Sequence, residues 1–204
     1  MTAPTSDKLL RSAARKSRKR EEKKAQIARS AQLVLQELGY ANTSLRDIAS
    51  RAGLSLGSLH YYFEDRTALI IYCVTSYKRR FSEQLQEAIA GANGRGAVIE
   101  VFTEALASSI VTDASTHRLW YDIRGQALFD PAFRPAVTDV ERMLIDSTES
   151  AMKQAGGDQS VDGAFVYALI DGLFRYHLQG VITGNAYMKD RIQQDFKALL
   201  DGVF

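Results

Sequence analysis

The chain has 204 residues, 46% of them hydrophobic, a formal net charge of +2 and a single cysteine, Cys73. This length is enough to bury a core without disulfides or metal, and a cysteine that cannot pair within the chain favours a reducing compartment. No signal-peptide-like start and no run of roughly 20 apolar residues is present, so we expect a cytoplasmic protein without a membrane partner.

The charge is divided unequally along the chain. Residues 8–24 hold nine Lys or Arg against two Glu, a net +7, whereas residues 81–204 hold 10 basic and 17 acidic residues, a net −7. A positive end followed by a negative remainder indicates that only the N-terminal part meets a polyanion. Because residues 1–19 are also poor in large apolar groups, we expect a basic flexible arm there. It would contact DNA phosphates or a minor groove, or else act as a solubilising tail.

Two helices are predicted next. Apolar residues recur at helical spacing from Ile27 to Leu38, and Gly39 stands where a C-terminal glycine cap belongs. A second helix starts at Ser44, with Asp47 three residues on as in a capping box, and Gly53 stops it.

The stretch AGLSLGSLHYYF, residues 52–63, predicts a third short helix capped by Ser55. A turn of three residues, 53–55, separates it from the second helix, which is the helix-turn-helix pattern with glycine in the turn. Leu59 and Phe63 are four apart and face inward, leaving hydroxyls and rings outside. Such a face fits the reading of groove edges and phosphates.

Residues 43–70, TSLRDIASRAGLSLGSLHYYFEDRTALI, resemble the DNA-binding domain of the TetR family of bacterial transcriptional regulators. The matching positions are Thr43, Ile48, Ala49, Ala52, Gly53, Leu54, Ser55, Gly57, Ser58, Leu59, Tyr61, Phe63 and Leu69. His60 stands where the family often has tyrosine, and Arg66 where it usually has lysine. The resemblance implies an all-α protein with a three-helix DNA-binding domain at residues 20–65 and a larger effector-binding and dimerisation domain at residues 66–204. It also implies a ligand-responsive repressor that binds a palindromic double-stranded operator as a homodimer, with a small-molecule effector and no cofactor.

The resemblance also assigns candidate DNA contacts. Phosphate contacts are expected from Thr43, Ser44, Tyr62 and Arg66, groove contacts from Ser55, Leu56, Gly57, Ser58 and Tyr61, and either kind from Arg46; His60 lies on the same face.

Helical stretches are predicted beyond residue 66 up to about residue 90, and then at 97–110, 114–128, 132–155, 160–183 and 187–202. Residues 165–182 are apolar nearly all round, so that helix must be buried on two sides. Resemblance to TetR regulators makes the second side a partner subunit, in a four-helix bundle with the helix at 132–155. The expected interface residues are Val140, Met143, Leu144, Ser147, Phe165, Leu169, Leu173 and Tyr176. A monomer with a buried central helix is the alternative.

Aromatic and polar groups mix in residues 116–133, and apolar pockets with a few polar groups are typical of small-ligand sites. The candidate lining residues are Phe102, Leu106, His117, Trp120, Tyr121, Arg124, Phe129, Tyr167, Phe174 and His177, with ordinary core packing as the alternative. Asp171 lies inside the apolar run and is expected to pair with Arg175 or with a ligand cation.

The competing functions are an enzyme and an architectural DNA-binding protein without an effector. The sequence has no Gly-rich phosphate loop, HExxH, cysteine cluster or GxSxG, and its three histidines show no metal-ligand spacing. Enzymatic activity is therefore disfavoured. An aromatic-rich acidic part favours a sensor over an architectural protein.

Overall fold

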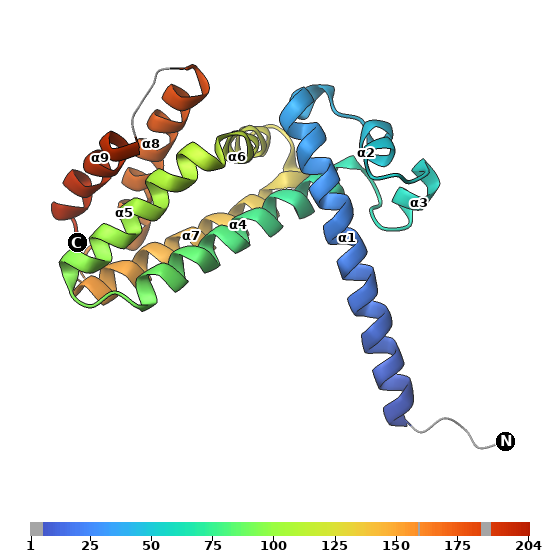
Figure 1. Cartoon of the computed structure of the whole chain (residues 1–204), viewed down its shortest axis with the longest axis horizontal. Coiled ribbons are helices and arrows are strands. Elements are labelled where there is room, and N and C mark those ends of the chain that lie inside the picture. Colours follow the sequence, from blue (N-terminus) through green and yellow to red (C-terminus); the bar gives the residue numbers. More distant parts are fainter. Residues whose placement is uncertain (1–5, 159, 185–188) are drawn as a thin grey trace. The chain divides into compact units, whose positions relative to one another are not determined.

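Every regular element of the described residues is a helix. The structure, a computed structural model, describes residues 6–158, 160–184 and 189–204, and side chains from Leu10 onward. Figure 1 shows the elements in chain order. They are α1 (Ser6–Asn42), α2 (Leu45–Arg51), α3 (Leu56–His60), α4 (Arg66–Ala90), α5 (Arg95–Thr112), α6 (Ala114–Gln126), a 3-10 helix η1 (Pro131–Phe133), α7 (Arg134–Ala155), α8 (Gly163–Ile182) and α9 (Lys189–Asp201). The all-α expectation is confirmed.

The chain forms two compact units, Met1–Cys73 and Val74–Phe204. The division falls inside α4 and therefore later than the expected boundary at residue 65. The first turns of α4 belong to the first unit because Leu69 and Cys73 are buried in the same core as Ile27 and Ile48. Local sequence signals mark where a helix begins, whereas a domain boundary depends on where its buried face changes partners.

In the first unit, α1 supplies one wall of the core with Ile27, Ala31 and Val34, all at most 4% exposed. Its regular path is interrupted at the predicted glycine, Gly39, which has φ 76° and ψ 169°. Thr43 Oγ1 donates a hydrogen bond of 2.8 Å to the Gly39 carbonyl, which the interruption leaves without its helical partner.

The helix-turn-helix forms through the predicted caps. Ser44 and Asp47 exchange both bonds of a capping box at the start of α2. Gly53 ends that helix with φ +64°, and the Ser55 side chain accepts from the Ser58 N–H to start α3. Leu59, fully buried, then fixes α3 against the core.

The expected flexible arm is helical from Ser6 onward, as part of α1; residues 1–5 lie outside the described residues. This segment is rich in Ala, Lys, Arg and Glu, which favour helix strongly. Ion pairs one turn apart add to it, since Arg18 Nε lies 3.5 Å from Glu22 and Lys24 Nζ lies 3.7 Å from Glu21. The exposed basic side chains are thus carried on a helix.

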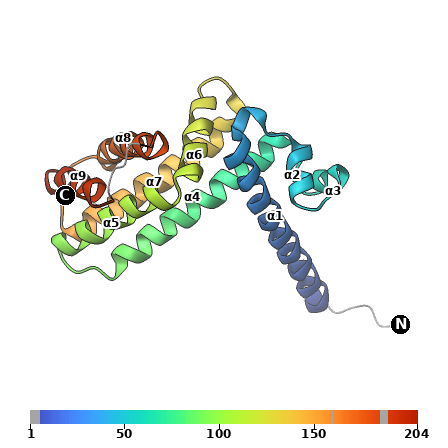
Figure 2. The same cartoon turned by 45° about the horizontal axis from the view of Figure 1, so that its top comes forward.

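In the second unit, α5 packs against α6, α7, α8 and α9, and α8 packs against α6, α7 and α9. The second part of α4 runs beside α7 in both views (Figures 1 and 2). Ser82 and Ser147 join these two helices through hydroxyls 2.7 Å apart, and Gln154 Nε2 donates to the Ile89 and Ala92 carbonyls at the end of α4. The predicted helices after residue 90 all exist, and their ends differ by a few residues. No helix in the described part of the chain has the length and apolar character needed to span a membrane.

We predict that Gly53→Ala destabilises the helix-turn-helix by about 1–2 kcal/mol, because a side chain at φ +64° is strained although the space around it is open. Hydrogen–deuterium exchange over residues 44–63 would measure the loss of protection. Gly57→Ala is the matched control, since Gly57 also lies in open space but within α3 and without a positive φ. Equal protection in both variants would contradict the role of the left-handed turn.

Candidate nucleic-acid interface and ligand pocket

The exposed side of α3 gathers hydroxyl, imidazole and phenol groups. Ser55, Gly57, Ser58 and His60 are exposed, and Tyr61 is 63% exposed. The Ser55 and Ser58 hydroxyls lie 2.8 Å apart, and His60 Nδ1 lies 3.1 Å from the Glu64 carbonyl oxygen. These bonds hold the side chains in place while leaving further donor and acceptor capacity toward solvent. Leu56, at the start of α3, is half-buried.

The basic part of α1 reaches this face of the first unit. The Arg20 guanidinium carbon lies 5.9 Å from the centre of the Tyr61 ring, which contacts the Tyr62 ring edge to face at 5.0 Å. One turn along α1, the Lys24 ammonium lies 5.6 Å from the Phe63 ring. Positive charge and exposed aromatic groups therefore lie on one surface, a combination suited to a phosphate backbone.

Two residues that were expected to contact phosphates, Thr43 and Arg66, form hydrogen bonds within the first unit instead. The Thr43 side chain is 3% exposed, and its hydroxyl is committed to Gly39. The Arg66 guanidinium donates to the Tyr40 carbonyl and stacks 4.3 Å from the centre of the Tyr40 ring. Both side chains satisfy carbonyls left free near the end of α1, which a sequence pattern does not reveal.

The other three expected contacts lie at the surface. Ser44 and Arg46 are exposed at the start of α2, and Tyr62 is half-buried. The Ser44 hydroxyl is 2.5 Å from the Asp47 carboxylate, so it is already engaged in the capping box.

The second unit contains a small, mainly apolar pocket with a cavity volume of about 40 Å³. Side chains from α4, α5, α6, α7 and α8 surround it: Lys78, Phe81, Leu85, Phe102, Leu106, Tyr121, Leu144, Ser147, Thr148, Tyr167, Ile170, Asp171 and Phe174. Phe102, Leu106, Tyr121, Tyr167 and Phe174 are among the predicted lining residues. An apolar lining with a few polar groups is the composition typical of a small-ligand site.

The other predicted lining residues lie elsewhere. Phe129 is 83% exposed, in the turn after α6, so its assignment to the pocket is wrong. His177 is fully buried with Nε2 3.2 Å from the Asp195 carboxylate, which places it between α8 and α9. His117, Trp120 and Arg124 stand behind the lining and contact residues that form it.

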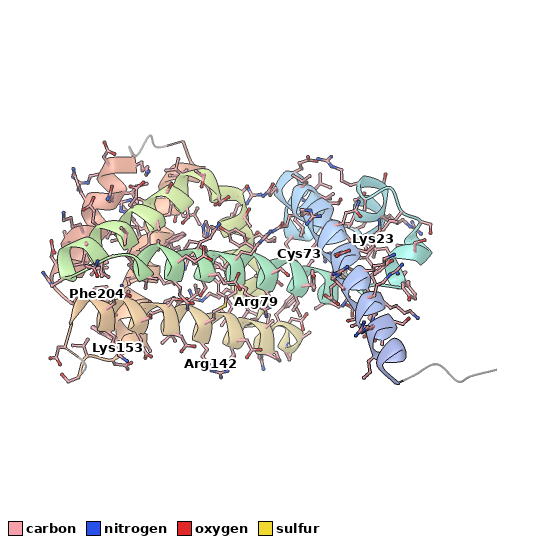
Figure 3. The ribbon with its side chains drawn as sticks, turned by 60° about the horizontal axis from the view of Figure 1, so that its bottom comes forward. Lys23, Cys73, Arg79, Arg142, Lys153 and Phe204 are labelled. Carbon is pink, nitrogen blue, oxygen red and sulfur yellow. The ribbon has the colours of Figure 1, made fainter. Side chains whose placement is uncertain are left out.

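Lys78 is the cationic residue of the lining, and it was not among the residues predicted to line the pocket. It is 3% exposed, whereas the next residues, Arg79 and Arg80, are exposed; Figure 3 labels Arg79 on α4. In sequence the three look like one solvated basic run. The available signal is the spacing, because Lys78 lies four residues after Val74 and three before Phe81, both buried on the same side of α4.

Lys78 ends a chain of hydrogen-bonding groups. Its Nζ lies 3.3 Å from His117 Nδ1, and His117 Nε2 lies 2.8 Å from the Tyr77 hydroxyl. Burial lowers the pKa of Lys78 to about 7, and burial together with Lys78 lowers the pKa of His117 well below its usual range. His117 is therefore neutral. When Lys78 is charged, Nδ1 of His117 must accept a hydrogen bond from the ammonium, so the imidazole proton lies on Nε2.

The negative lining residue, Asp171, is paired within the second unit. Its carboxylate accepts from the Tyr121 hydroxyl at 2.9 Å and from the Arg124 guanidinium, and Arg124 also pairs with Glu141 at 2.7 Å. The expected pairing with Arg175 is wrong, because Arg175 lies over the Tyr121 ring at 5.9 Å. Arg124 lies on α6 and links α7 to α8, whereas a pair between Asp171 and Arg175 would stay within α8.

The predicted dimer residues divide into two groups. On α8, Phe165 and Tyr176 are 57% and 59% exposed, Leu169 is 36% exposed and Leu173 is half-buried. On α7, Val140, Leu144 and Ser147 are buried within the subunit, so their assignment to a subunit interface is wrong; Met143 is half-buried. The apolar side of α7 faces its own core, and its outer side carries exposed charged residues that include Arg142 and Lys153 (Figure 3).

Cys73 is buried, its thiol donates to the Ala28 carbonyl, and burial raises its pKa to about 12, so it is not a thiolate at neutral pH. The described side chains form no group of three or more His, Cys, Asp or Glu that could hold a metal ion.

Comparisons with known proteins agree on one family. Residues 27–73 match the model of the bacterial regulatory proteins of the tetR family. The HTH-type transcriptional regulator PksA of Bacillus subtilis is 24% identical over 180 residues, which cover 85% of this chain and 86% of PksA. The HTH-type transcriptional regulator TtgR of Pseudomonas putida is 26% identical over 172 residues, covering 76% and 80%.

Solved structures show the same fold. A putative transcriptional regulator from Pseudomonas aeruginosa PAO1 aligns with a TM-score of 0.76 at 19% identity, covering 89% of this chain and 90% of that one. The multidrug binding protein EbrR, solved with imidazole, aligns with a TM-score of 0.65 at 21% identity, covering 86% and 93%. The curated relatives are transcriptional regulators, not enzymes.

We predict that Lys78→Met stabilises the second unit at pH 6. The folded state holds Lys78 with a pKa of about 7, against an ordinary 10.5, so between these values the unfolded chain binds more protons and stability rises with pH. The cost of the buried charge is complete below pH 7, and each pH unit up to 10.5 removes up to about 1.4 kcal/mol of it.

Urea unfolding followed by the fluorescence of Trp120, the single tryptophan, measures this unit directly. The advantage of Lys78→Met over the parent should narrow as pH rises from 7 to 10. The exposed Lys153→Met is the control and should show no such trend. A constant difference at all pH values would contradict a buried, titrating Lys78.

Proposed function

Because the chain belongs to the TetR family of bacterial transcriptional regulators, we propose that it is a dimeric repressor that reads a palindromic operator with α3 and responds to a small molecule in the pocket of the second unit. The observation that carries this proposal is the exposed face of α3, held by the Ser55 cap and by Leu59 within the segment that matches the family. Since the operator lies on bacterial DNA, the protein would act in the cytoplasm.

Two neighbouring surfaces of the first unit would share DNA binding. Ser55, Ser58 and Tyr61 on α3 would meet base edges and phosphates in the major groove. The basic side chains of α1 would neutralise phosphates, and each phosphate contact would add to the salt dependence of binding. The proximity of Arg20 to Tyr61 supports a single continuous interface.

The dimer would form through α8. Its exposed apolar residues, Phe165, Leu169 and Tyr176, recur at spacings of four and seven along the helix and form a stripe that an isolated subunit leaves in water. A twofold dimer places two recognition helices about one DNA turn apart, which matches a palindrome.

The effector would act by binding the DNA-incompetent state more tightly. Helix α4 supports this proposal because one uninterrupted helix contributes Leu69 to the core beneath α2 and α3, and Phe81 and Leu85 to the pocket. A coupling of about 1–3 kcal/mol between operator and effector is typical of such regulators.

Selection from random duplex DNA at near-physiological salt tests the proposal directly. Recovery of one palindrome would support a sequence-specific regulator. Binding without a motif that disappears as salt rises would instead favour an architectural DNA-binding protein.

We predict that Tyr61→Ala weakens binding to the selected operator about ten- to a hundredfold. The reason is the loss of a hydrogen bond to a charged group, which contributes roughly 1.5–3 kcal/mol. Fluorescence anisotropy with labelled operator would measure the affinity. Circular dichroism should be unchanged because Tyr61 is mostly exposed. Parent-like affinity would remove Tyr61 from the interface.

We predict that Leu169→Arg converts the dimer to a monomer, because it places a charge within the apolar stripe of α8. Analytical ultracentrifugation would measure the mass. Val111→Arg is the matched control, since Val111 is a similarly exposed apolar residue, 44% exposed, on α5. A Leu169→Arg dimer as stable as the parent would exclude α8 as the interface.

A further inference from the structure

The pocket of the second unit contains a buried cation without a carboxylate partner. Lys78 Nζ has no carboxylate within ion-pairing distance among the described residues, and its one hydrogen-bonding neighbour there is the neutral His117. An ammonium has three N–H donors, so two remain after the bond to His117. A buried charge left this way is costly unless something pairs with it.

Aromatic rings surround this ammonium in place of an anion. The centres of the Phe81 and Trp120 rings lie 5.3 Å from Nζ, and those of Tyr77 and Phe174 lie 5.9 Å away. Their faces favour a cation and their edges exclude water. These rings thus stabilise the Lys78 ammonium in part and exclude water from its two remaining N–H donors.

A second polar group in the pocket also lacks a partner. Tyr167 is 8% exposed, its hydroxyl is buried and has no hydrogen bond, and it lines the same cavity. Burial raises the pKa of Tyr167, so its hydroxyl stays protonated and is available as a donor. Unsatisfied buried polar atoms of this kind are rare in folded proteins and commonly mark the place of a ligand or water.

The other charged lining residue, Asp171, bears on the charge of the ligand. Asp171 is already matched by Arg124 and by the Tyr121 hydroxyl, so a cationic ligand would have to displace these contacts and would also meet Lys78. An anion can pair directly with Lys78, because no carboxylate of the described residues lies within ion-pairing distance of its Nζ and Asp171 acts on it only from farther away.

We propose that this pocket takes a compact amphipathic carboxylate, whose anionic group pairs with Lys78 and whose apolar body lies among Phe81, Phe102 and Phe174. This inference rests on the proposed function by making that pocket the effector site. The Tyr167 hydroxyl is a second anchor for a polar substituent on the ligand. No covalent step is involved.

The groups that face Lys78 make the interaction depend on pH. His117 and Tyr77 adjoin it, and Asp171, Arg124 and Glu141 form the charged cluster of α6, α8 and α7. Because burial lowers the pKa of Lys78 to about 7, Lys78 changes charge near neutral pH. Carboxylate affinity should therefore fall as pH rises from 6 to 9.

The test uses nearly isosteric pairs of an anion and a neutral molecule: phenylacetate, 3-phenylpropionate and octanoate, each against its primary amide. Trp120 lies beside Lys78, so its fluorescence reports binding to the full-length protein, and calorimetry confirms the stoichiometry. At pH 6.5 at least one acid should bind tenfold or more tightly than its amide. The preference should vanish in Lys78→Met and persist in Lys153→Met.

Retained amide binding by Lys78→Met would show that the variant pocket is intact. Equal affinity for acid and amide in every pair, no binding of any pair, or a preference that survives in Lys78→Met would each overturn the proposal. Adding a phenolic hydroxyl, as in 3-(4-hydroxyphenyl)propionate, should improve binding to the parent and not to Tyr167→Phe. Equal improvement in both proteins would remove Tyr167 from the site.

Operator binding is measured separately, so the two proposals fail in distinguishable ways. A protein that selects a palindrome but ignores every acid keeps its function as a regulator and loses this ligand class. A protein that binds acids through Lys78 but selects no DNA motif keeps the ligand class and loses the proposed function.

Discussion

The buried face of α4 is the constraint on which both units depend. One helix supplies Leu69 and Cys73 to the core of the first unit and Phe81, Leu85 and Ile89 to the interior of the second. The apolar spacing must therefore continue without a break over the whole length of the helix, and a proline or glycine within it would disturb both cores.

The helix-turn-helix was predictable because its signals are local. Ser44, Asp47, Gly53 and Ser55 specify two helix starts and a left-handed turn within a dozen residues, and each acts on the backbone of its neighbours. Thr43 shows the limit of such reasoning, because its hydroxyl is taken by a carbonyl that becomes free only when α1 breaks at Gly39.

The pocket and the subunit surface were predicted less well, because periodicity shows that one side of a helix is buried but not what covers it. The apolar side of α7, with Val140 and Leu144, packs against its own core rather than a partner. Phe129 projects outward because α6 ends just before it. The burial of Lys78 was not predicted because the next two residues in the chain are also basic. Only the tertiary fold shows that this lysine is buried and that the two arginines are exposed.

Arg124 lies where three helices meet, since its guanidinium binds Asp171 on α8 and Glu141 on α7 from its own position on α6. Removing Arg124 leaves two carboxylates without their shared cation, whereas removing either carboxylate leaves Arg124 paired with the other alone. Substitutions at the three positions are therefore non-additive, and a change at one alters which changes at the others are tolerated. In the divergence of such chains these three sites would therefore change together rather than one at a time.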